Sequence, residues 1–120
     1  MIDDRTPPPP PPGLADPGRD LWHAITSRWH LDNREVALLG QASATADLIA
    51  RLEELLTKDG LTVAGSTGQP RLNQVVTEIR QQRLTLDRLL SSLSLPPAAD
   101  EAPRVSRRSE LAARRRWDSG

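Results

Sequence analysis

The sequence predicts an all-α fold, made of a short N-terminal helix and a long antiparallel helical hairpin. Apolar residues recur at alternating steps of four and three along two stretches, which a Gly-rich connection, LTVAGSTGQPR, separates. Residues at that spacing share one side of a helix. Each apolar stripe must be buried, and the other helix is the nearest surface against which it can pack. The two stripes are Leu38, Ala42, Thr45, Ile49, Leu52 and Leu56, and Val75, Ile79, Gln82, Leu86, Leu89 and Leu93.

Composition divides the 120 residues into three parts. We expect residues 1–18 to be a disordered Pro-rich arm, residues 19–97 to be a helical oligomerisation domain, and residues 98–120 to be a basic tail. The tail should hold a short helix that is either exposed or ordered only on binding. So small a domain is often stabilised by oligomerisation. The absence of Cys excludes disulfides and Cys-based zinc sites, and no apolar run reaches the length of a membrane span.

The N-terminal part contains six consecutive prolines, 7–12, which favour an extended arm. Such an arm either docks in an aromatic groove of a partner or is a stiff, solvated leader. Asp16 is the expected N-cap of the first helix, with Pro17 at the first helical position. The helix should run to about Trp29, and its Trp22–Trp29 face should anchor it against the hairpin or a neighbouring subunit.

The boundaries of the hairpin helices are marked by capping residues. Asp32 is the expected N-cap of the first long helix, Glu35 completes a capping box, and Gly60 ends the helix. Asn73 is the expected N-cap of the second helix, which should continue to about Leu93. We expect the packing positions of the core or of an oligomer interface to be Trp22, Trp29, Ile49, Leu52, Leu56, Ile79, Leu86 and Leu93.

The residues predict no catalytic site, cofactor site or metal site. His23 and His30 lie two helical turns apart, too distant for a compact metal site, and no Ser or acid is patterned with them. The segment 60–67, GLTVAGST, has Ser66 where a phosphate-binding P-loop needs Lys, and it follows a helix rather than a strand. The segment 65–68 lacks the strands and basic residues of a KH loop, so we interpret it as a turn after a short extended piece.

A local excess of positive charge lies in the C-terminal tail, where residues 104–117 hold six Arg against the single acid Glu110. These side chains are suited to non-specific phosphate contacts, and Trp117 to stacking on a base or filling a protein pocket. The alternative is a solvated tail with no fixed partner. The candidate DNA-binding residues are Arg104, Arg107, Arg108, Arg114, Arg115 and Arg116.

The segment GLTVAGSTGQPRLNQVVTEIRQQRLTLDRLLSSLSLPP resembles the small terminase subunits of tailed bacteriophages. The resemblance rests on the GLTV…G..G connection, the E.R step at Glu78–Arg80 and the LSLPP end at 93–97, and it covers about residues 19–97. This chain departs from the pattern at Asn73-Gln74, where His-Pro is frequent in the family, and at Ser94, where glycine is usual.

The resemblance implies a non-enzymatic ring of about eight to ten subunits that acts in the host cytoplasm. It would recognise viral double-stranded DNA, present it to the large terminase subunit and modulate the ATPase and nuclease of that subunit. DNA that threads the ring and DNA that wraps it are both compatible with these residues. The alternative function is a protein-interaction adaptor without a nucleic-acid role, docking through the Pro arm and Trp117.

Overall fold

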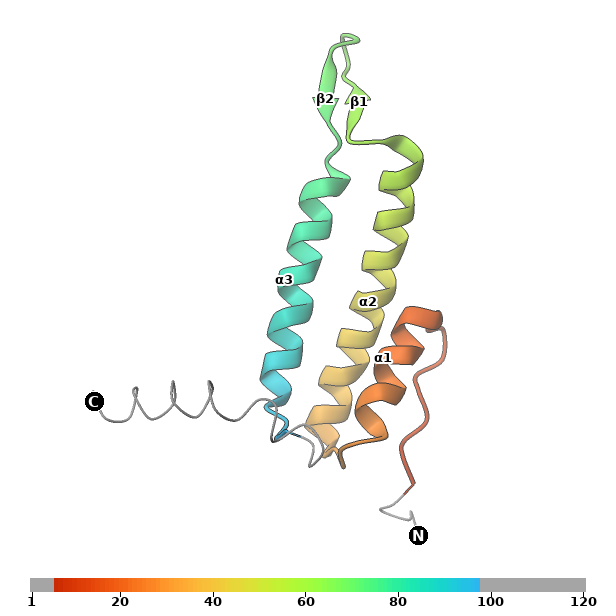
Figure 1. Ribbon diagram of the computed structural model, residues 1–120, viewed down its shortest axis with the longest axis vertical. Coiled ribbons are helices and arrows are strands. Elements are labelled where there is room, and N and C mark those ends of the chain that lie inside the picture. Colours follow the sequence, from red (N-terminus) through yellow and green to blue (C-terminus); the bar gives the residue numbers. More distant parts are fainter. Residues whose placement is uncertain (1–5, 98–120) are drawn as a thin grey trace, which may run out of the picture.

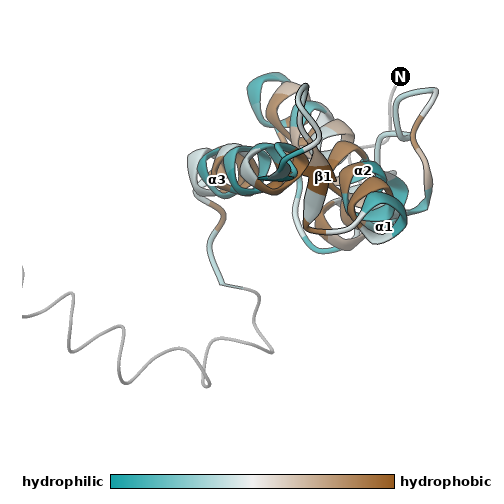
Figure 2. Ribbon diagram, turned by 90° about the horizontal axis from the view of Figure 1, so that it is seen from above, coloured by the Kyte–Doolittle hydropathy of each residue, from teal (hydrophilic) through white to brown (hydrophobic). Residues whose placement is uncertain are grey.

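The computed structural model describes residues 6–97 (Figure 1). Its elements follow the order α1 (Asp16–Thr26), α2 (Asn33–Asp59), β1 (Thr62–Ala64), β2 (Pro70–Leu72) and α3 (Val75–Leu93). Helices α2 and α3 form an antiparallel hairpin, and α2 lies between α3 and α1 (Figures 1 and 2). The expected mostly helical fold is confirmed, with one correction: the connection between α2 and α3 is a two-stranded antiparallel sheet.

The ends of α2 agree with the capping pattern in the sequence. The Asp32 carboxylate accepts the backbone N–H of Glu35 at 2.8 Å, and the Glu35 carboxylate accepts that of Asp32 at 3.0 Å. This capping box satisfies two N–H groups that the first turn leaves without helical partners. At the other end, Gly60 adopts a φ of +82°, a conformation that side chains disfavour, and its N–H donates to the Leu56 carbonyl.

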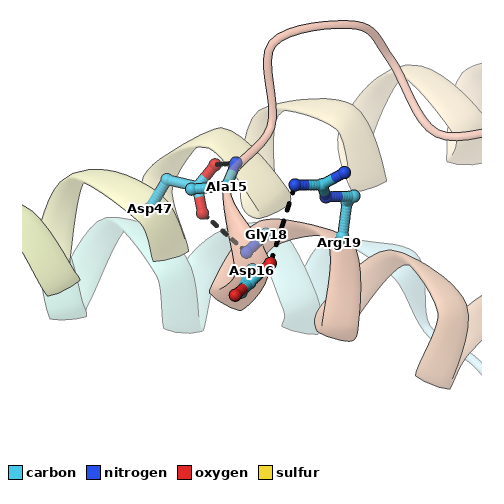
Figure 3. Close-up of polar contacts among 5 residues, drawn as sticks. All are labelled: Ala15, Asp16, Gly18, Arg19 and Asp47. Carbon is cyan, nitrogen blue, oxygen red and sulfur yellow. Dashed lines mark hydrogen bonds and ion pairs between the residues drawn. The ribbon is translucent and has the colours of Figure 1, made fainter.

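The start of α1 corrects two predictions. The helix begins at Asp16, inside the range assigned to the arm, and its N-cap is Ala15 rather than Asp16. The capping group comes instead from α2, because the Asp47 carboxylate accepts the N–H groups of Ala15 and Gly18, both at 2.7 Å (Figure 3). Asp16 instead forms an exposed ion pair with Arg19. The helix also ends at Thr26, earlier than the expected end near Trp29.

Residues 6–15 are not the disordered arm that the proline run predicts. The Trp22 indole N–H donates to the Pro8 carbonyl at 2.9 Å, and the segment continues past Gly40 of α2, next to Pro11. A buried indole N–H needs an acceptor, and a proline-rich chain has little conformational freedom to lose when it supplies one. These contacts fix the approach of the chain to α1. Residues 1–5 of the expected arm lie outside the described residues.

The main core lies at the end of the hairpin away from the strands, where α1 covers α2. Trp22, Leu39 and Leu93 are buried there, one from each helix. Trp29 is half-buried, and its indole N–H donates to the Pro96 carbonyl at 2.7 Å. This bond holds the segment after α3 against the same end of the molecule. The partly buried residues packed against the core are Leu21, Ile25, Leu31, Val36, Leu38, Leu90 and Leu95.

The α3 helix begins one residue later than the Asn73 cap predicts, with Gln74 at its N-cap position. The buried Asn73 side chain still accepts the Val75 N–H at 3.1 Å and also donates to the Gly60 carbonyl at 3.0 Å. It therefore ties the start of α3 to the end of α2 across the β-hairpin. At the end of α3, Ser94 has a φ of +50°, the left-handed conformation that a glycine would adopt at lower cost.

Candidate interaction surfaces

The half of the hairpin nearest the strands consists of only two helices, because α1 begins beside Asp47 and runs toward the other end (Figure 1). Two packed helices cover one stripe of each other and leave the remaining sides exposed. Ile49 and Ile79 are buried between α2 and α3, whereas six large apolar residues there and on the strands are 37–64% exposed. The six are Leu48, Leu55, Leu61, Val63, Leu72 and Leu84.

The first surface lies on α2, and we call it the α2 ridge: Leu48, Arg51, Glu54, Leu55 and Lys58. At Leu48 and Arg51 it borders residues 11–14 of the Pro-rich segment. Leu48 and Leu55 are seven residues apart, so they lie on the same side of the helix. A shallow depression around Leu55 is lined only by ridge residues. The predicted stripe does not include this surface. Its signal in the sequence is that Leu48 and Leu55 directly precede the stripe residues Ile49 and Leu56.

The second surface lies between α2 and α3, and we call it the hairpin groove. Glu53 and Arg83 cross it with an ion pair of 2.9 Å between two exposed side chains, so its contribution to stability is at most about 1 kcal/mol. The pair also shows which levels of the two helices face each other. The groove is lined by the apolar residues Leu56, Val76, Ile79 and Leu84 and by the charged residues Glu53, Arg80, Arg83 and Asp87.

The β-hairpin projects beyond the ends of α2 and α3 (Figure 1). Its strands pair Thr62 with Leu72, and the turn closes with the Gly65 N–H donating to the Gln69 carbonyl at 2.7 Å. Gly68 has a φ of +81°, which explains a glycine there. The Gly-rich connection is therefore a structural turn, as the sequence predicts, and it exposes the apolar side chains of Leu61 and Leu72.

The predicted packing residues divide into two groups. Trp22, Ile49, Ile79 and Leu93 are buried, whereas Trp29, Leu52, Leu56 and Leu86 are half-buried. The predicted DNA-binding arginines and Trp117 lie outside the described residues.

Between residues 6 and 97, no three His, Asp or Glu side chains gather where they would hold a metal ion, and both His are exposed. No helix in that range has the length and apolar character to cross a membrane. The chain matches no protein-family model, no curated protein and no solved structure.

Proposed function

We propose that this chain is the small terminase subunit of a bacteriophage DNA-packaging motor. It would form a ring, bind viral double-stranded DNA, and present that DNA to the large terminase subunit in the host cytoplasm. The supporting observation is where the motif residues lie. The GLTV segment runs from the C-cap of α2 into strand β1, Glu78 and Arg80 lie in the first turns of α3, and LSLPP begins with the last residue of α3.

Self-association is the part of this proposal with the most support from the exposed surfaces. Apolar side chains on an uncovered helix pair are more characteristic of an interface than of a free surface. The α2 ridge and the hairpin groove provide two such surfaces on one chain. DNA contact is assigned to the Arg-rich tail, and a ring would multiply each weak tail contact by the number of copies.

The adaptor remains the second candidate, and the exposed apolar residues of the β-hairpin favour it. Its docking elements would be the β-hairpin and Trp117. The Pro-rich segment is a poorer docking element than the sequence suggests, because its Pro8 carbonyl is already bonded to Trp22. The two functions differ in one simple respect: a packaging subunit binds random duplex DNA at low salt, with an affinity that falls steeply as salt rises, and the adaptor does not bind it.

Replacing Arg114, Arg115 and Arg116 together with Ala should weaken duplex DNA binding without changing the oligomer size. Because each phosphate contact contributes about 0.9 to the slope of log affinity against log salt, the triple variant should lower that slope by about 2–3. Mobility-shift titrations at several salt concentrations measure the slope.

The matched control removes three exposed arginines from the helical domain, Arg34, Arg71 and Arg88. It should leave the slope close to that of the wild type. Equal affinities of the tail variant and the wild type at low salt would contradict the assignment of DNA contact to the tail. An equal loss in both variants would contradict it as well.

A further inference from the structure

The α2 ridge and the hairpin groove have complementary character. The ridge presents Leu48 and Leu55 from a single helix, whereas the groove offers apolar side chains between two helices. Because the surfaces use different residues, a contact between the ridge of one copy and the groove of another is heterologous. Each pair so formed leaves one free ridge and one free groove for further copies, so the assembly grows head to tail and becomes a ring when the rotation between copies closes.

The charges give this contact a direction. The Glu53–Arg83 ion pair marks one level of the hairpin. Arg51 lies two residues from Glu53 along α2, toward the core end. Asp87 lies four residues from Arg83 along α3, in the same direction. Their heights along the hairpin therefore differ by about 3 Å. In the other direction, toward the strands, Glu54 lies one residue from Glu53 and Arg80 lies three residues from Arg83. Their heights along the hairpin also differ by about 3 Å.

A neighbour that points the same way, at the same level, therefore sets Arg51 opposite Asp87 and Glu54 opposite Arg80. If the neighbour were antiparallel instead, Arg51 of one copy would lie near the height of Arg80 of the other, and Glu54 near that of Asp87. Like charges would then meet. Like-charge contacts across an interface are unfavourable and select against the wrong orientation.

The four charged side chains also have no ion-pair partner in the part of the chain that the structure describes. Within residues 6–97, Arg51, Glu54, Arg80 and Asp87 form no ion pair. Their charges are thus available to a neighbouring copy, whereas Glu53 and Arg83 already satisfy each other. At the edge of an apolar contact, such charges set register and orientation more than they set affinity.

We infer that the α2 ridge of one copy packs into the hairpin groove of the next, with all copies parallel and at the same level, an inference that rests on the self-assembly in the proposed function. The polarity has a consequence for the whole assembly. All β-hairpins lie on one rim, and all chains leave α3 from the opposite rim, where Trp29 holds Pro96 (Figure 1). Pro97, the last described residue before the Arg-rich tail, therefore lies at the same rim in every copy.

Cysteine cross-linking tests the contact directly, because the chain contains no Cys of its own. The double variant Arg51→Cys/Asp87→Cys should form a ladder of disulfide-linked multimers under mild oxidation, resolved on a non-reducing gel. Each single variant should remain uncross-linked, since the head-to-tail contact sets residue 51 opposite residue 87 and not opposite itself. The control Arg51→Cys/Arg88→Cys should give no ladder, because Arg88 is displaced by about 100° around α3 from Asp87.

Charge reversal provides a second measurement on the exposed positions. Arg51→Asp should shift the solution mass toward smaller species, and adding Asp87→Arg should restore the mass of the wild type. A wild type that assembles while the double-cysteine variant forms no ladder overturns this interface and leaves the proposed function standing. Cross-linking in the single Arg51→Cys variant indicates a two-fold contact and also overturns it. A monomeric wild type overturns both the interface and the proposed ring.

Discussion

Replacing Trp22 with Ala should lower the free energy of unfolding by about 3–5 kcal/mol. Trp22 is 1% exposed and meets Leu39 and Leu93 in the only core to which all three helices contribute among the described residues. The substitution leaves a large cavity and deprives the Pro8 carbonyl of its indole donor. The loss is a large fraction of the stability of a small domain, so α1 and the Pro-rich segment should detach.

Trp29→Ala is the matched control, since Trp29 also donates its indole N–H to a proline carbonyl but is only half-buried. It should cost clearly less than Trp22→Ala. Chemical denaturation followed by circular dichroism measures both, at one protein concentration because self-association changes the apparent stability. Equal losses in the two variants would contradict the position of the core.

Replacing Gly18 with Ala should destabilise the fold by about 1–3 kcal/mol, although alanine is the better helix former. An added β-carbon would lie 2.6 Å from the Ser43 carbonyl oxygen and 2.7 Å from an Asp47 carboxylate oxygen. The Ser43 oxygen belongs to the α2 backbone and cannot rotate away. Relieving the contact requires α1 to move away from α2. That movement lengthens the hydrogen bonds that the N–H groups of Ala15 and Gly18 donate to the Asp47 carboxylate (Figure 3).

Gly40→Ala is the control of opposite sign. Gly40 is also helical, and among the described residues an added β-carbon would meet only Pro11, at an ordinary contact distance of 3.8 Å. The substitution should be neutral or stabilise the protein by up to about 1 kcal/mol, because alanine restricts the unfolded chain and favours the helix. Thermal unfolding of the two variants compares them. A stabilising Gly18→Ala would contradict the close approach of α1 to α2.

The sequence predicts the parts of the fold that depend on residues close together in the chain. The Asp32–Glu35 capping box spans one helical turn, and Gly60 acts at its own position, so both ends of α2 follow from local pattern. The start of α1 does not, because its capping carboxylate is Asp47, about thirty residues away, and that partnership exists only after folding. The sequence predicts the β-hairpin only as an extended piece and a turn, since three-residue strands carry little periodicity.

The sequence likewise predicts one part of the interaction surfaces and not the other. The stripes of the sequence predict which side of α2 meets α3, and Ile49 and Ile79 lie there. They do not predict how far α1 extends along α2, nor that Leu48 and Leu55 are exposed. An apolar residue in a helix indicates burial by some partner, and sequence periodicity alone does not distinguish a partner in the same chain from one in another copy.

The central claim is that the protein assembles into a closed ring, and its most direct test is the mass of the purified wild type in solution. Light scattering or native mass spectrometry at micromolar concentration should give one closed species of about eight to ten subunits. A monomer or a dimer under those conditions would contradict the ring and the packaging function built on it, and would favour the adaptor.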